Sequence, residues 1–148
     1  MNKSPNRFIA ITSGGLRLVF PMNFIQAVDD WKKPETLYGS VDWMLGFTPG
    51  ESIVKPVLNQ SFWGEEVLEP EVILVLEYRD IPLGIPGVAP DVIDGKPVRI
   101  SDTENLRDCI EWSIMEGGGI AWCVNIPRLY RTLDLRYDSG DNIGGLDA

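Results

Sequence analysis

The fold is decided by two similar stretches, of which the first reads Phe8-Ile9-Ala10-Ile11-Thr12, then Gly14-Gly15, then Leu16-Arg17-Leu18-Val19-Phe20-Pro21. The second reads Val72-Ile73-Leu74-Val75-Leu76, then Arg79-Asp80, then Ile81-Pro82-Leu83-Gly84-Ile85. In each, two short apolar runs flank a two-residue turn, which is typical of a β-hairpin. A further apolar run follows each hairpin, at residues 53–59 and 120–125. Two such units in one short chain predict a pair of small β-barrels.

Length and composition agree with this architecture. The chain has 148 residues, which suits one domain or two small subdomains that share an interface. Its 11 Pro and 15 Gly favour many short strands and turns over long helices. The acidic stretch 65–71 is the best candidate for a boundary. We therefore expect one domain over residues 1–148, with subdomains at about 7–64 and 71–131 and a mobile, Gly-rich tail at 138–148.

The net charge of -9 argues against two classes of partner. Such a surface repels nucleic acid phosphates and anionic lipids, so we expect no nucleic acid partner.

The start, Met1-Asn2-Lys3-Ser4-Pro5-Asn6, is polar and lacks the apolar core of a signal peptide. The longest apolar run, residues 72–76, is too short to span a bilayer. We expect a cytoplasmic protein that does not insert into a membrane.

The residue types available restrict the chemistry that the chain can perform. It has no His, so neither a Ser-His-Asp nor a Cys-His arrangement can form. The two cysteines, Cys109 and Cys123, lie among apolar residues and are expected to be buried free thiols. The acidic residues of 65–71 lack the Gly-fixed loop of a calcium site and are expected to be solvated. We expect no catalytic residue, no cofactor and no metal.

Several local signals are weaker. Residues 40–45 have a capping residue at Ser40 and could form a helical turn, and Pro127 could open another. Gly117-Gly118-Gly119 leads into a β-rich run, which indicates a hairpin turn rather than a phosphate loop. Among the five tryptophans, Trp122 lies within a predicted strand and is expected in the core. Trp43 and Trp63 lie near loops and are better candidates for a protein contact.

From about Arg7 to Arg131, the order of these features resembles a CheW-like domain, the coupling module of bacterial chemotaxis. The family pattern apolar-Pro-x-x-x-Val-x-x-Val stands here as Phe20-Pro21-Met22-Asn23-Phe24-Ile25-Gln26-Ala27-Val28. Further family positions are occupied by Gly46, by the run Ile53-Val54-Lys55-Pro56-Val57-Leu58-Asn59, by Gly84-Ile85 and by Val124-Asn125-Ile126-Pro127-Arg128-Leu129. Glu51 stands where the family has the Arg of an Asn-x-Arg-Gly turn.

The resemblance implies a mainly β fold of two five-stranded, SH3-like barrels packed together, with short helices. It also implies a non-enzymatic adaptor that couples chemoreceptors to the regulatory domain of a histidine kinase, in chemotaxis or a related pathway such as pilus control. Family members bind receptor helices in the groove between the barrels and kinase-like partners at the barrel ends. Carried onto matching positions, the candidate protein-binding residues are Met22, Ile25, Gln26, Val28, Glu51 and Val88.

Two other functions stay open. A diverged ligand-binding domain or carboxylate-based enzyme could use the cleft between the barrels, and it would need converging Asp or Glu side chains there. A structural partner that kept the fold but lost the coupling activity is the other, and the charge reversal at Glu51 motivates it. The sequence leaves the presence of a homo-oligomer open.

Overall fold

The computed structural model describes residues 7–36, 42–48, 55–100 and 107–135. Glu51 and the tail at 138–148 lie outside this part of the chain, as does part of the run at 53–59. Strands dominate the described residues, and the helices among them are short. The elements are β1 (Arg7–Ser13), β2 (Leu16–Pro21), η1 (Met22–Phe24), β3 (Ile25–Asp30), β4 (Met44–Phe47), β5 (Pro56–Leu58), η2 (Gln60–Phe62), β6 (Val72–Tyr78), β7 (Ile81–Asp94), β8 (Val98–Arg99), β9 (Ile110–Glu116), β10 (Gly119–Val124) and α1 (Ile126–Thr132).

Both predicted hairpins are confirmed. β1 pairs antiparallel with β2, and β6 pairs antiparallel with β7. At the first turn, Gly14 and Gly15 have φ of 63° and 86°, a left-handed backbone that favours glycine. At the second turn, Arg79 and Asp80 take φ of 54° and 66° without that help. The first turn thus has chemistry suited to its backbone, whereas the second depends on the pairing of its flanking strands.

The two later strands join the hairpins in an exchanged order. β10 lies parallel to β2, and β5 lies parallel to β7, where Val57 pairs with Gly84. Each hairpin therefore receives the strand that the sequence pattern assigned to the other unit. The assignment of each later run to the hairpin before it is wrong, because the two runs are alike in composition and nothing local selects the hairpin that each joins. The strands fall instead into a β1 group (β1, β2, β8, β9, β10 and residues 88–94 of β7) and a β6 group (β3, β4, β5, β6 and residues 81–87 of β7).

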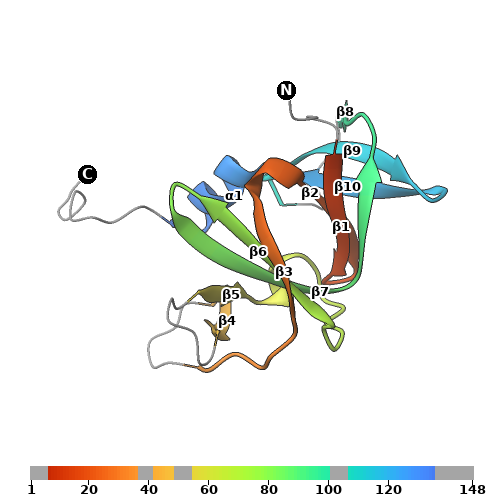
Figure 1. The fold of residues 1–148 in the computed structure, drawn as a ribbon. Helices are drawn as coiled ribbons and strands as arrows, with labels where there is room; N and C mark the ends of the chain where they lie inside the picture. The colour runs from red at the N-terminus through yellow and green to blue at the C-terminus, as the bar shows by residue number, and fades with distance from the viewer. Residues whose placement is uncertain (1–6, 37–41, 49–54, 101–106, 136–148) are drawn as a thin grey trace.

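A single long strand, β7, serves both groups. Its first half pairs with β6 and its second half with β1, so the hydrogen-bonded path from β3 to β8 is continuous. In Figure 1, the green ribbon of β7 runs beside β6 and then turns to run beside β1. The turn coincides with a register shift at Ala89, whose φ is 55°. The Ala89 carbonyl accepts a 2.7 Å hydrogen bond from Arg17 Nη1, which holds this bulge in place.

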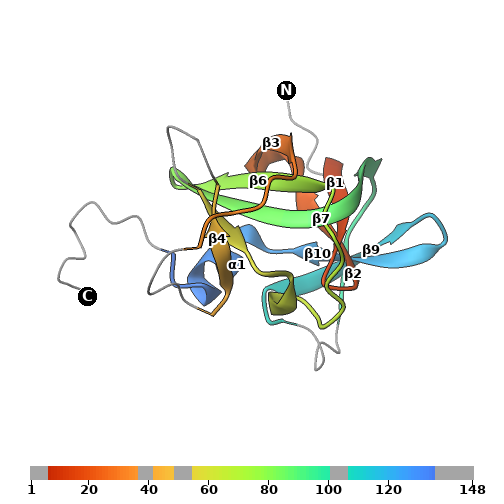
Figure 2. The ribbon, with the colours of Figure 1, turned by 90° about the horizontal axis from the view of Figure 1, so that it is seen from below.

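The largest core is shared between the two groups. It draws Leu18 and Phe20 from the β1 group, Leu74 and Leu83 from the β6 group, and Tyr130 from α1. Its members are almost fully buried, and Figure 2 shows α1 set against the strands. Each group also has a smaller cluster of its own. Most of the buried apolar residues belong to this shared cluster. Separation of the two groups would therefore expose most of the core to water.

The weaker local predictions had mixed outcomes. The helical turn at Pro127 is confirmed as α1, where the Asn125 side chain accepts a 3.0 Å hydrogen bond from the Arg128 N–H. The helical turn expected at 40–45 is wrong where the structure describes it, because residues 44 and 45 belong to β4. Trp63 is buried in the shared core, so its expected role in a protein contact is also wrong. Trp43 and Trp122 are half-buried against the same core.

Candidate protein-binding surfaces

Four of the predicted binding residues lie together on η1 and β3. Val28 exposes 42% of its surface, and Gln26 is exposed, with its Nε2 donating a 2.9 Å hydrogen bond to Oε1 of Glu77. Met22 and Ile25 are half-buried and pack against the shared core. Within β3, Gln26 and Val28 thus point to solvent and Ile25 to the interior, because alternate strand residues point to opposite faces, and Met22 of η1 also packs inward.

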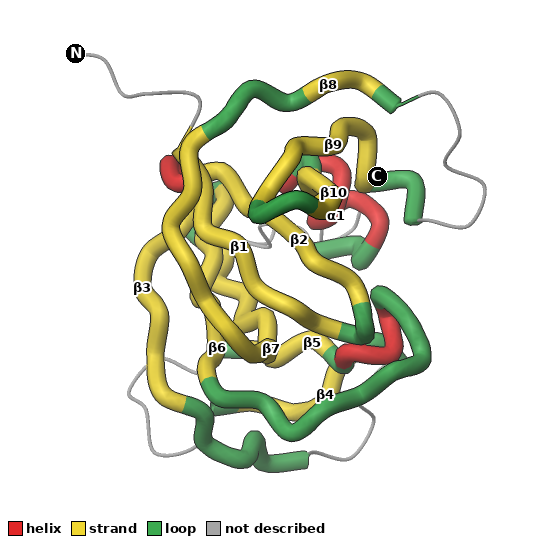
Figure 3. Tube along the Cα trace, turned by 90° about the vertical axis from the view of Figure 1, so that its right-hand side faces the viewer, coloured by secondary structure: helices red, strands yellow, loops and turns green. Residues whose placement is uncertain are grey.

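β3 is also an edge strand. Among the described strands it pairs only with β6, and Figure 3 shows it on the outside of the molecule. An edge strand presents unpaired backbone N–H and C=O groups, and an exposed Val28 adds apolar surface beside them. This combination can bind another protein through backbone hydrogen bonds and apolar contact.

Val88 lies apart from the other candidates. It is half-buried on β7 and pairs with Thr12 of β1. The residue before it, Gly87, pairs with Val72, which in turn pairs with Asp30 at the end of β3. This register places Val88 toward the Asp30 end of β3, away from Met22 and Ile25. Glu51, the remaining candidate, is outside the described residues.

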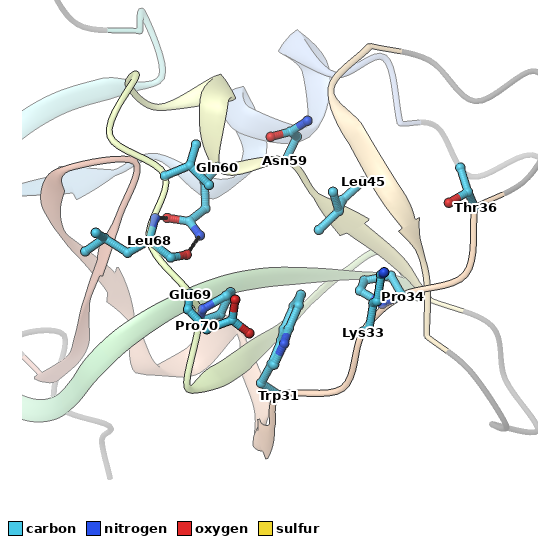
Figure 4. A pocket seen from close by; sticks show the side chains of 11 residues that line it. Trp31, Lys33, Pro34, Thr36, Leu45, Asn59, Gln60, Leu68, Glu69 and Pro70 are labelled. Atoms are coloured by element: carbon cyan, nitrogen blue, oxygen red, sulfur yellow. Dashed lines mark hydrogen bonds between the residues drawn. The ribbon is translucent and has the colours of Figure 1, made fainter.

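A pocket that the sequence analysis missed lies in the β6 group. It has a volume of about 580 Å³ and is lined from two sides. Figure 4 shows Leu68, Glu69 and Pro70 on one side, and Lys33, Pro34 and Thr36 on the other, with Trp31 and Leu45 between them. The remaining lining residues are Asn59, Gln60 and Val67. A signal existed in the sequence, where Val67-Leu68 stands as an apolar pair within the acidic stretch 65–71.

Hydrogen bonds hold both walls of the pocket. The side chain of Gln60, which is 4% exposed, accepts a 3.0 Å hydrogen bond from the Gly14 N–H and donates a 2.7 Å bond to the Leu68 carbonyl. At the other end of the same wall, the Glu71 carbonyl accepts a 3.1 Å bond from the Trp31 N–H. On the opposite wall, Glu35 exchanges two backbone hydrogen bonds of 2.8 Å with Phe47 of β4. Both walls of the pocket are therefore held in place by hydrogen bonds to neighbouring elements of the fold.

The described residues offer little catalytic chemistry. Both cysteines are buried and free, as predicted, and burial raises the pKa of Cys109 and of Cys123 to about 12, which keeps each thiol protonated. Among the residues that line the pocket, Glu69 is the only carboxylate. Within the described part of the chain, no three His, Cys, Asp or Glu side chains gather as a metal site would require.

No described helix has the length and apolar character needed to cross a membrane.

No protein-family model matches the sequence, and a search of curated proteins found no match. The fold is similar to that in the crystal structure of the scaffolding protein TtCheW from Thermoanaerobacter tengcongensis, with a TM-score of 0.70 and 10% sequence identity. The match covers 82% of this chain and 89% of that chain. At this identity the likeness shows the fold alone, a mainly β architecture of SH3-like subdomains.

Proposed function

We propose that this chain is a non-enzymatic cytoplasmic adaptor that couples chemoreceptors to a histidine kinase, in bacterial chemotaxis or a related chemosensory pathway. The observation that carries the proposal is the fold, which is similar to that of a scaffolding protein over most of both chains. The family pattern over residues 20–28 supports it, because residues 22–28 of that segment form η1 and the first part of the edge strand β3. Met22, Ile25, Gln26 and Val28 would contact the partner, and Glu51 and Val88 would add to that surface.

The alternative of a carboxylate enzyme has less support. It requires converging carboxylates in a cleft between the strand groups, whereas the pocket is lined by one carboxylate and lies in the β6 group. A single Glu cannot divide the roles of acid and base between two differently tuned groups. The described residues therefore favour a function that depends on surfaces.

The binding role is tested by substitution of Val28 with Glu. We expect the purified chain to bind the regulatory domain of the kinase, or the tip of a receptor, encoded in the same genome with an affinity in the micromolar range or better. Val28→Glu should weaken that binding about tenfold or more, because it removes an apolar contact and places a charge in the interface. Isothermal titration calorimetry measures the change.

Val92→Glu is the matched control. Val92 is also an exposed strand valine, at 54%, but it lies on β7 where that strand pairs with β1. We expect its effect on affinity to stay below about twofold, because a lone exposed apolar residue contributes little outside an interface. Equal losses in both variants would argue against β3 as the binding surface. If neither partner binds the wild-type chain at micromolar concentration, the coupling role is wrong and a fold that has lost coupling is the better description.

A further inference from the structure

We propose that the pocket in the β6 group binds an extended segment of a partner protein in which a large apolar side chain is flanked by Lys or Arg. One wall of the pocket is the acidic strap, defined as residues 65–71, and the other is the segment 31–36 with Leu45 of β4. This surface differs from the β3 edge, so the inference goes beyond the adaptor role and does not depend on it.

The apolar part of the argument rests on exposed side chains that gather at one place. Leu45 exposes 37% of its surface, Val67 58% and Leu68 41%, and all three line the pocket. Trp31 and Pro70 extend this apolar lining. Exposed apolar residues scattered over a surface need no explanation, but a group of them around a hollow is typical of a binding site. An apolar side chain that enters the hollow would remove several of these groups from water together.

The negative charge of the strap indicates that the residues beside the apolar anchor of the bound segment are basic. Glu65, Glu66 and Glu69 are exposed, and none of them forms an ion pair with a described residue. The fourth carboxylate, Glu71, accepts a 3.1 Å hydrogen bond from the Ala89 N–H. Their combined field at short range attracts a cationic segment, and the net charge of -9 adds a weaker attraction at long range.

The opposite wall gives the bound segment a direction. Lys32 and Lys33 are exposed there, and Lys33 lines the pocket. The strap carries four carboxylates, whereas the segment 31–36 carries Lys32, Lys33 and Glu35, so the two walls together favour a basic ligand while Lys33 repels a cation on its own side. The basic residues of the partner should therefore lie along the strap, with neutral or acidic residues next to Lys33.

A polypeptide fits the lining better than a small polar molecule does. A small metabolite needs several converging donors and acceptors, whereas the amide of Gln60 already bonds to Gly14 and Leu68. The exposed Glu69 is the one acidic group in the lining. Most of the other side chains that line the pocket are apolar. They can contact a large apolar side chain of a peptide without requiring one particular shape.

Selection from a phage library of random short peptides tests the proposal with the full chain. We expect the enriched peptides to carry Leu, Ile, Phe or Trp with Lys or Arg nearby. The most enriched peptide, made synthetically, should bind Leu68→Ser about tenfold or more weakly, since the variant loses a buried apolar contact. The double variant Glu66→Gln/Glu69→Gln should bind it about fivefold more weakly at low salt, and the difference should shrink as salt is added.

Two controls match these variants. Met115→Ser removes an exposed apolar side chain, 66% exposed, from the β9–β10 hairpin, which projects from the body in Figures 1 and 2. Asp80→Asn/Asp91→Asn removes two exposed carboxylates that do not line the pocket. Both should leave peptide affinity within about twofold of wild type. Thermal unfolding of each variant establishes that it is folded before its affinity is compared.

Three outcomes would overturn the proposal. They are selection without enrichment above background, enriched peptides without basic residues, and peptides that bind Leu68→Ser as tightly as wild type. Failure of the adaptor role would have a different signature. In that case the kinase and receptor would not bind, while the selected peptide would still bind wild type and Val28→Glu alike.

Discussion

Replacement of Gly14 by alanine is expected to destabilise the protein by about 4 kcal/mol. Gly14 has φ of 63°, and a Cβ built there would lie 2.5 Å from the Gln60 carbonyl oxygen and 2.7 Å from the Gly64 backbone nitrogen. Backbone atoms of η2 and of the residues that follow it cannot move aside as the end of a flexible side chain can. The substitution therefore adds an overpacking penalty of about 1–3 kcal/mol to the cost of a left-handed alanine, about 1–2 kcal/mol. Urea unfolding followed by tryptophan fluorescence measures the loss.

Gly117→Ala separates these two costs. Gly117 has φ of 59° in the turn between β9 and β10, nearly the same backbone as Gly14, but a Cβ there would meet nothing within 4 Å. Only the conformational cost remains, so we expect a loss of about 1–2 kcal/mol. If Gly14→Ala and Gly117→Ala lost the same stability, the contact between the first hairpin and the η2 region would not be as close as the structure shows.

This comparison also shows which parts of the fold could be predicted from the sequence. The hairpin at Gly14-Gly15 was predictable because a turn and its flanking runs are adjacent in the chain. The helix after Asn125 was predictable for the same reason, since the cap and Pro127 are local signals. The contact between Gly14 and the η2 region joins residues nearly fifty positions apart, as the bond from Gly14 to Gln60 illustrates, and no local pattern indicates it.

The exchange of strands between the two units was unpredictable for a physical reason. Val57 pairs with Gly84. A side chain at position 84 would collide with Ile73 of β6, so glycine is needed there. This contact exists only after β6 and β7 have paired. The extension of β7 through the bulge at Ala89 likewise depends on Arg17 and Glu71, which come from distant parts of the chain. Alternation of apolar residues identifies a strand, but its neighbours are selected by such contacts.

The candidate site divides in the same way. The family pattern pointed to η1 and β3, and the structure places those residues together because they are contiguous. The pocket combines residues 31–36, 45, 59–60 and 67–70, which only the tertiary fold brings together. The acidic strap was interpreted from its charge as a solvated linker. Its Val67 and Leu68 are the residues that make it a wall of a pocket.

Replacement of Gln60 by leucine is the second change with a large expected effect, a loss of about 3 kcal/mol. The Gln60 side chain is almost fully buried and joins the first hairpin to the acidic strap through Gly14 and Leu68. Leucine preserves much of the volume but leaves the buried Gly14 N–H without its acceptor, which costs about 1–3 kcal/mol. Leu68 is 41% exposed, so its carbonyl is expected to bond to water instead, and loss of the bond to Gln60 should also loosen the strap. Urea unfolding measures the stability, and hydrogen exchange at the Gly14 amide reports the broken bond.

Gln26→Leu makes the same chemical change at an exposed site. Gln26 also donates a side-chain hydrogen bond, to Glu77, but both groups can bond to water instead, so we expect a loss below about 0.5 kcal/mol. A similar loss in both variants would mean that burial of the Gln60 amide is not the source of its effect. Because Gln60 holds the strap, Gln60→Leu should also weaken the peptide selected for the pocket, while Gln26→Leu leaves it bound. A variant that lost the stability but kept full peptide affinity would show that the strap stays in place without this amide, and that Gln60 acts through the first hairpin alone.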